Sequence, residues 1–202
     1  GHDVSEYDIY DGMIMRHNEP VMEWREACNR LSADSITGRA STSREIRNKY
    51  DREGNSHGVQ FVDLDVDTET GVITLNRIIA MQACGQAVVR KTVESQIIGG
   101  VIQGASYALF ENKLLDRQTG AMVNPNLEQY KVLGAGDMPH IQPIIWTKGQ
   151  TGVRPLGEPP VVPTAGAIAC AVYNAIGSPV RSLPITPDKV LDAVEAAGGG
   201  AA

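Results

Sequence analysis

The chain has 202 residues, of which 42% are hydrophobic, and this suits one large domain or one domain with a smaller additional unit. Its net charge of −6 argues against general nucleic-acid binding, and no apolar run approaches the roughly 20 residues that a membrane-spanning helix needs. The wide spacing of the cysteines Cys28, Cys84 and Cys170 argues against a disulfide framework, a zinc site or an iron–sulfur site within this chain.

The first third of the sequence predicts small elements followed by a polar stretch. Residues 3–15 predict a short strand or hairpin around Asp11-Gly12. Residues 21–31 have helical spacing, and Cys28 is predicted to be a small core residue of that helix. Residues 34–58 form a polar stretch that is either a surface loop or a partner-facing arm, and the pattern favours the loop.

The next segment predicts a β-hairpin. Residues 59–67 alternate apolar residues with aspartates, Asp67 to Gly71 has turn chemistry, and residues 72–81 form a second apolar run. The aspartates of the first strand indicate either a divalent-ion site or the water-facing side of the strand. The second interpretation is favoured, because a metal site needs convergent ligands rather than a row.

A glycine-rich segment at residues 95–110 predicts an unusual helix. It contains three glycines, each costing about 1 kcal/mol against alanine in a helix interior. Such residues indicate that another backbone or a flat ligand approaches closely. The amides of Gln96 and Gln103 are therefore either ordinary helix-surface groups or, as a functional alternative, groups presented to a buried polar cofactor.

The C-terminal part predicts an edge strand and two helices. Residues 141–146 form a strand interrupted by Pro143, which indicates an edge. Residues 164–172 predict a buried helix of small residues, including Cys170, and Gly177 marks the end of this helix. A last helix opens at Thr186-Pro187-Asp188.

One carboxylate lies in an unusually stiff stretch, Gly157-Glu158-Pro159-Pro160. Proline fixes its own φ and restricts the residue before it, so the backbone at Glu158 is stiff. A carboxylate on a rigid loop before a buried helix is well placed to act as a base, and burial would raise its pKa. The alternative is a solvated loop residue, and spacing alone favours this alternative.

Several segments together resemble one known family. Gly157-Glu158-Pro159-Pro160 with the alanine-rich helix after it, and the stretch 183–191, look like the C-terminal end of the molybdenum-binding subunit of the xanthine dehydrogenase/aldehyde oxidase family. Residues 65–85 and 95–104 resemble the family's Asp-Cys-Gly and Gly-Gln-x-x-Gly-Gly-x-x-Gln-Gly stretches. Residues 124–130 also have a counterpart in the family, so four segments match in order over about residues 57–194.

The resemblance implies an α+β fold of mixed and antiparallel strands with packed helices, like the second molybdenum-cofactor-binding domain of molybdenum hydroxylases. It implies three parts: residues 1–56, a strand, helix and polar arm related only loosely to the family; residues 57–197, the C-terminal part of the molybdopterin-binding domain; and residues 198–202, a frayed tail.

The resemblance also implies a reaction and a set of partners. Glu158 would be the base on a molybdenum-bound hydroxide during oxidation of an aldehyde or N-heterocycle. Gln96, Gly99, Gly100 and Gly157 would contact molybdopterin, in its simple or cytosine dinucleotide form, and no protein ligand to the metal is expected. Electrons would leave through 2Fe-2S and FAD groups on iron–sulfur and flavin subunits.

The family's subunit is several times longer, so the chain is expected to be a C-terminal portion of it that is separately encoded, cleaved or expressed as a fragment. It would need the remaining molybdenum-subunit polypeptide to complete the site and would be inactive without it. The alternative function is a non-catalytic structural or assembly fragment that keeps the family fold. The start of the chain has no signal-peptide pattern, so the expected location is the cytoplasm, or the periplasm if a partner carries the chain there.

Overall fold

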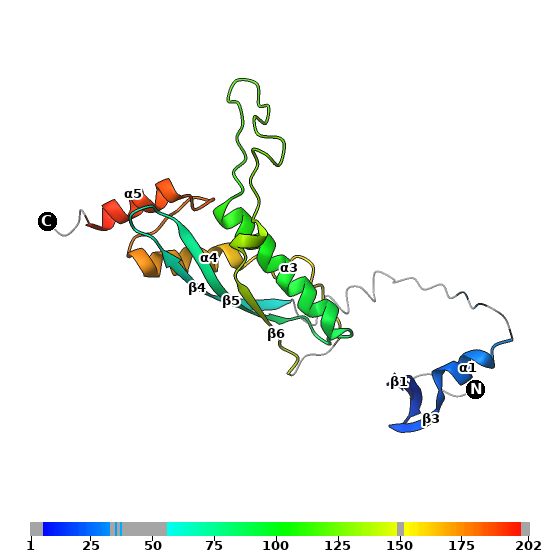
Figure 1. Ribbon diagram of the computed structural model, residues 1–202. Coiled ribbons are helices and arrows are strands. Elements are labelled where there is room, and N and C mark those ends of the chain that lie inside the picture. The colour runs from blue at the N-terminus through cyan, green and yellow to red at the C-terminus, as the bar shows by residue number, and fades with distance from the viewer. Residues whose placement is uncertain (1–5, 33–34, 36, 38–55, 149–151, 199–202) are drawn as a thin grey trace, which may run out of the picture. The chain divides into compact units, whose positions relative to one another are not determined.

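The computed structural model of the chain describes residues 6–32, 35, 37, 56–148 and 152–198 (Figure 1). The chain divides into two compact units, Gly1–Arg47 and Asn48–Ala202. Almost all of the polar stretch predicted at residues 34–58, and residues 199–202 of the predicted tail, lie outside the described residues.

The first unit is a three-stranded antiparallel sheet with one short helix. Strands β1 (Tyr7–Tyr10), β2 (Met13–Arg16) and β3 (Glu19–Glu23) pair in chain order. Asp11 and Gly12 join the first two strands with φ of 47° and 75°, as a two-residue hairpin turn with positive φ at both positions requires. The hairpin predicted at Asp11-Gly12 is therefore confirmed.

The helix of this unit is shorter than the sequence predicts. Helix α1 spans Trp24–Asn29, because residues 22–23 still pair with β2 at the end of β3 and residue 30 caps the helix. The backbone N–H of Trp24 donates to the carbonyl oxygen of Gly12 at 2.8 Å, which fixes the point where the strand becomes helix. Cys28 is exposed, so its predicted place in a core is wrong.

The second unit is built on a three-stranded mixed sheet. Strands β4 (His57–Val66) and β5 (Ile73–Ala83) form the predicted antiparallel hairpin, and β6 (His140–Ile145) lies parallel to β5 on its other side. The side chain of Asp67 accepts hydrogen bonds from the backbone N–H groups of Glu69 and Thr70 in the hairpin turn. In the described part of the chain β6 pairs only with β5, which confirms the edge position predicted from Pro143.

Two helices cover one face of this sheet. Helix α3 (Arg90–Leu109) packs against β5 and β6, helix α4 (Thr164–Ile176) packs against β4, and the two helices contact each other. The core between sheet and helices contains fully buried side chains from every layer, namely Ile78, Ile97, Val101, Ile168 and Val172. The helix predicted before Gly177 is confirmed, although only the face that carries Ile168 and Val172 is buried, and Gly177 ends it with a φ of 76°. Cys170 lies on its exposed side, contrary to prediction.

The last helix, α5 (Pro187–Gly198), packs on α4 through the fully buried Val190. It begins where the sequence predicts. The hydroxyl of Thr186 hydrogen-bonds to Asp188, and this bond lowers the pKa of the Asp188 carboxyl from its ordinary value. The backbone N–H of Ile185 donates to the carbonyl oxygen of Ala108 at 2.7 Å, which ties the start of α5 to the end of α3.

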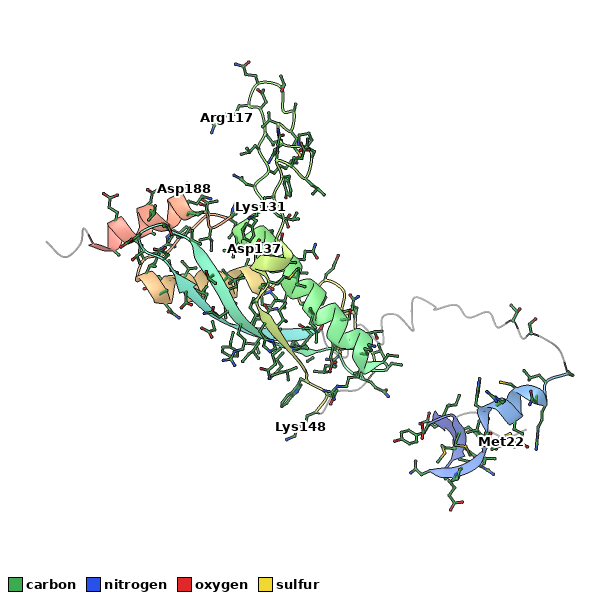
Figure 2. All side chains as sticks on the ribbon, in the orientation of Figure 1. Met22, Arg117, Lys131, Asp137, Lys148 and Asp188 are labelled. Carbon is green, nitrogen blue, oxygen red and sulfur yellow. The ribbon has the colours of Figure 1, made fainter. Side chains whose placement is uncertain are left out.

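A long arm, residues 110–133, projects from the end of α3, with Arg117 near its far end and Lys131 near its base (Figures 1 and 2). Buried Asn124 holds it together, accepting from the backbone N–H of Leu114 at 3.0 Å and donating to the carbonyl oxygen of Asn112 at 2.7 Å. A short helix, η2 (Ala135–Asp137), follows the arm and leads to β6. None of the helices in the described ranges is long and apolar enough to cross a membrane.

Candidate functional site

The loop that carries Glu158 is aligned by the end of β5. Val153 forms an isolated antiparallel bridge with Gly85, and the backbone N–H of Arg154 donates to the carbonyl oxygen of Cys84 at 3.0 Å. After this pairing the chain bends at residues 157–158 and turns into α4. The carbonyl oxygen of Glu158 accepts a hydrogen bond from the N–H of Val161 at 2.9 Å, so Glu158 is the first residue of a β-turn.

Three elements hold the residues directly after Glu158. The carbonyl oxygen of Pro160 accepts from the Nε2 of Gln60 on β4 at 2.7 Å and from the hydroxyl of Thr164 on α4 at 3.2 Å, and both bonds are buried. The hydroxyl of Tyr107 on α3 donates to the carbonyl oxygen of Val161 at 3.4 Å. Since buried hydrogen bonds are costly to leave unmade, the loop has one strongly preferred position.

The glycines of α3 differ in what they contact. A Cβ at Gly100 would lie 2.7 Å from the Cβ of Pro160, and a Cβ at Gly104 would collide with the side chain of Thr164. Close approach of another backbone, one of the alternatives left open by the sequence, is confirmed at Gly100, where the backbone of Pro160 and Val161 lies 3.2 Å from the Cβ position, whereas at Gly104 the close neighbour is a side chain. At Gly99 a Cβ would have no neighbour within 4 Å, and the residue is exposed.

The structure brings the predicted site residues to the same end of the second unit. The position of a Cβ at Gly157 lies 4.0 Å from the Oε1 of Gln96, and Gly99 and Gly100 follow Gln96 on the same helix. Gln96, Gly157 and Glu158 are all exposed. The burial that the sequence suggested for Glu158 is therefore absent in the described part of the chain.

Glu158 lines an open cavity of about 620 Å³ between its own loop and the start of β4. The opposite wall carries two polar groups, the buried amide of Gln82 and the hydroxyl of Ser56. Gln82 Nε2 donates to the Ser56 oxygen at 2.7 Å, and the Ser56 hydroxyl donates to the carbonyl oxygen of Ala83 at 2.9 Å. Sequence reasoning missed both residues, although Gln82 is a polar residue at an inward-facing position of an apolar strand.

Gln96 lines a second, smaller cavity of about 230 Å³ together with Cys84 and Arg154. Cys84 is 2% exposed, and burial raises the pKa of its thiol, so this cysteine remains a neutral thiol at ordinary pH. In the described ranges, no group of three or more His, Cys, Asp or Glu side chains is arranged to hold a metal ion.

Sequence comparison relates the chain to molybdenum-containing oxidoreductases. The family described as "Molybdopterin cofactor-binding domain" matches residues 2–139, which includes the N-terminal unit that the motifs related only loosely to it. The chain is 32% identical over 191 residues to the "Putative xanthine dehydrogenase molybdenum-binding subunit XdhA" of Escherichia coli K12, covering 92% of this chain and 25% of that protein. It is 30% identical over 198 residues to the "Aldehyde oxidoreductase molybdenum-binding subunit PaoC" of the same strain, covering 95% of this chain and 26% of the other.

Structural comparison gives the same result for the fold. The aldehyde oxidoreductase of Desulfovibrio gigas superposes with a TM-score of 0.62 and 25% identity, over 69% of this chain and 15% of that one. The predicted α+β fold is thus confirmed, and the chain spans about a quarter of the length of the curated relatives named above. The chain belongs to the molybdopterin cofactor-binding domain family, as part of a molybdenum-binding subunit of the xanthine dehydrogenase and aldehyde oxidoreductase type.

Proposed function

We propose that this chain supplies Glu158 as the general base of a molybdenum hydroxylase that oxidises an aldehyde or an N-heterocycle. The observation that carries the proposal is the fixed position of Glu158. Its loop is held by buried hydrogen bonds from β4 and α4 and by a partly buried one from α3, while its carboxylate remains open to a cavity. Glu158 lies beyond the residues matched by the family, so its role rests on this geometry and on the motif around it.

The residues beside Glu158 fit a molybdopterin cofactor. The exposed side of α3 offers an amide at Gln96 and bare backbone at Gly99, where no atom lies within 4 Å of a Cβ position. Gly157 is a second position, near Gln96 Oε1, where no side chain covers the backbone. Amide groups and unobstructed backbone suit a flat, polar pterin, and a bound molybdenum cofactor would supply two-electron redox chemistry and oxygen transfer.

The glycines of α3 and of the Glu158 loop have different roles in this proposal. Gly99 and Gly157 would leave room for the cofactor. Gly100 acts indirectly, since its missing Cβ lets Pro160 approach α3 and so sets the position of Glu158. Direct contact between Gly100 and the cofactor stays a prediction from the resemblance.

Glu158 would accept the proton released when oxygen is transferred to the substrate. A general base must lie within hydrogen-bond reach of the proton, and the loop before α4 fixes where the Glu158 carboxylate can be. The Gln82 amide and the Ser56 hydroxyl on the facing wall are placed to orient a polar group in the same cavity.

Because the chain spans about a quarter of its relatives, the remaining polypeptide of the molybdenum-binding subunit would close the site. Iron–sulfur and flavin subunits would then carry 2Fe-2S and FAD and remove the electrons. The form of the pterin, simple or cytosine dinucleotide, and the compartment, cytoplasm or periplasm, stay predictions from the resemblance.

The test replaces Glu158 with Gln in the assembled enzyme. Glu158→Gln keeps the size of the side chain, so the fold and the molybdenum content should not change, whereas turnover should fall by about 10²–10⁴-fold. Glu195→Gln, an exposed carboxylate of α5, is the matched control and should retain full turnover. Turnover within about tenfold of the unmodified enzyme would refute the role of Glu158. An assembled protein without molybdenum and pterin would instead support the alternative, a non-catalytic assembly fragment.

A further inference from the structure

The face of the β4–β5–β6 sheet that points away from α3 and α4 is apolar at one end. Val59 pairs with Met81, and Met81 pairs with Ile144. Phe61 and Ile79 begin the next row, which Gln142 of β6 completes, and Trp146 follows the end of β6. The open sheet face is defined by these six residues: Val59, Phe61, Ile79, Met81, Ile144 and Trp146.

The open sheet face is not covered by any described part of the second unit. Phe61 is 65% exposed, and Val59 and Trp146 are each 42% exposed. The neighbouring side chains on the same strands, such as the fully buried Ile78, point the other way into the core. Scattered exposed apolar residues are ordinary, but a contiguous group on one sheet face indicates an interaction surface.

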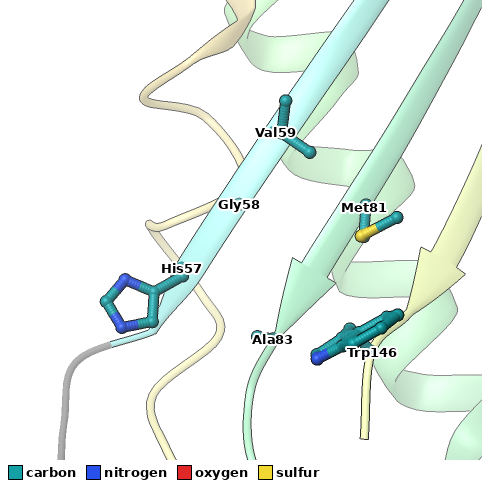
Figure 3. Close-up of a pocket in the computed structure, with 6 residues that line it drawn as sticks. All are labelled: His57, Gly58, Val59, Met81, Ala83 and Trp146. Carbon is teal, nitrogen blue, oxygen red and sulfur yellow. The ribbon is translucent and has the colours of Figure 1, made fainter. Parts of the chain in front are cut away.

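A shallow cavity of about 310 Å³ lies at the end of this face (Figure 3). Its lining is almost entirely apolar and includes Val59, Met81 and Trp146. The backbone N–H of Trp146 donates to the carbonyl oxygen of Gln82 at 2.9 Å, which fixes the backbone of Trp146 beside β5. Trp146 lies just beyond the end of β6, but its backbone is held by this hydrogen bond, so the surface is formed before any partner binds.

The charged residues of this sheet face lie at its other end, while two uncharged or weakly basic polar residues flank the apolar rows: Gln142 beside Ile79 and His57 beside Ala83. Asp63 pairs with Arg77, and Arg77 pairs with His140, beyond the rows of apolar residues. Separation into an apolar core and a charged margin is typical of a protein–protein interface. The apolar end is also the end beside the candidate site, since Gly58 lines both the apolar cavity and the Glu158 cavity.

We propose that the open sheet face packs against an apolar surface of the remaining polypeptide of the molybdenum-binding subunit. The chain covers only about a quarter of its relatives' length, so about three quarters of such a subunit lies outside it. A polypeptide that closes the Glu158 cavity reaches Gly58, and from there it continues directly onto Val59 and Met81. A second copy is the weaker candidate, because each chain carries a net charge of −6 and two copies repel.

Hydroxyl-radical footprinting tests the proposal, because Met81 and Trp146 carry readily oxidised side chains. The chain is labelled by itself and together with the polypeptide that supplies the rest of the subunit. Oxidation of Met81 and Trp146 should slow by about tenfold in the assembly, since interface cores exclude water. Unchanged oxidation in the assembly would overturn the proposal, and so would protection that grows with the concentration of the chain by itself, which indicates a second copy.

A charge placed on the face gives a second, independent measurement. Phe61→Asp leaves the core side of β4 unchanged and should lower the fraction of assembled subunit by about tenfold or more. Val72→Asp adds the same charge at an exposed apolar residue, 48% exposed, at the turn end of the hairpin, and should leave assembly unchanged. Equal assembly of the two variants would overturn the proposal. The readout is assembly and not turnover, so the result is independent of whether Glu158 is the base.

Discussion

Replacing Gly100 with alanine separates the packing role of this glycine from its effect on helix stability. A Cβ at this position would lie 2.7 Å from Pro160 Cβ and 3.2 Å from both Pro160 C and Val161 N. Carbon atoms prefer separations of about 3.5–4.0 Å, so the loop must move by roughly 1 Å. Pro160 also accepts two buried hydrogen bonds, and such a shift would strain both.

The matched control is the neighbouring residue of the same helix. Gly99→Ala adds the same methyl group where nothing lies within 4 Å, so it gains the helix propensity of alanine, about 1 kcal/mol, without a clash. Gly100→Ala gains the same propensity but adds an overpacking cost of about 1–3 kcal/mol. We therefore expect Gly100→Ala to be less stable than Gly99→Ala by about 1–3 kcal/mol.

Urea unfolding of the 202-residue chain, followed by circular dichroism, measures this difference. In the assembled enzyme Gly100→Ala should also lower turnover by up to about 10²-fold, because a displacement of about 1 Å at a reacting group is sufficient for such a loss. If Gly100→Ala stabilised the chain as much as Gly99→Ala, the close packing of Pro160 on α3 would be refuted.

The remaining predictions concern the hydrogen bond that holds the Glu158 loop, the hydrophobic core and the loss of stability at low pH. Gln60→Leu removes the buried donor to Pro160 and should lower the free energy of unfolding by about 1–3 kcal/mol, measured by urea unfolding; no loss would contradict the anchoring role. Ile78→Ala empties a fully buried core position and should cost about 2–5 kcal/mol in the same assay, and a smaller loss would place Ile78 outside the main core. The hydrogen bond from Thr186 lowers the pKa of Asp188 in the folded state, so its stabilisation is present at neutral pH and is lost as the pH falls through that lowered pKa. Asp188→Asn should therefore lose less stability on acidification than the unmodified chain, and an equal loss in both would contradict this assignment.

The sequence predicted the elements whose signals are local. Turn chemistry at Asp11-Gly12 and at Asp67 located both hairpins, and Gly177 and Thr186 located a helix end and a helix start, because these residues act on the backbone beside them. The helix expected at residues 21–31 began three residues late, since β3 continues to Glu23 and its last residues, Met22 and Glu23, pair with β2. Spacing also placed Cys28 and Cys170 in a core, yet both are exposed, because a helical pattern shows a periodicity and does not show which neighbours cover a face.

The candidate site was predictable only in part. Gly157, Glu158 and Gln96 were found from motifs, and the structure places them at one end of the second unit. The residues that hold the loop were not found, because Gln60 is separated from Pro160 by 100 residues and no local pattern links them. Gln82 and Ser56 were missed for the same reason. Gln82 lies near the end of β5 and Ser56 directly before β4, so their hydrogen bond joins residues that are distant in the sequence.

The central claim is that Glu158 moves a proton in the oxidation step, and the rate at which substrate reduces the fully assembled enzyme tests it most directly. This single-turnover measurement separates the chemical step from substrate binding and product release. With molybdenum content matched, Glu158→Gln should slow the reduction by about 10²–10⁴-fold while the substrate Kd changes little. A reduction rate equal to that of the unmodified enzyme would contradict the account.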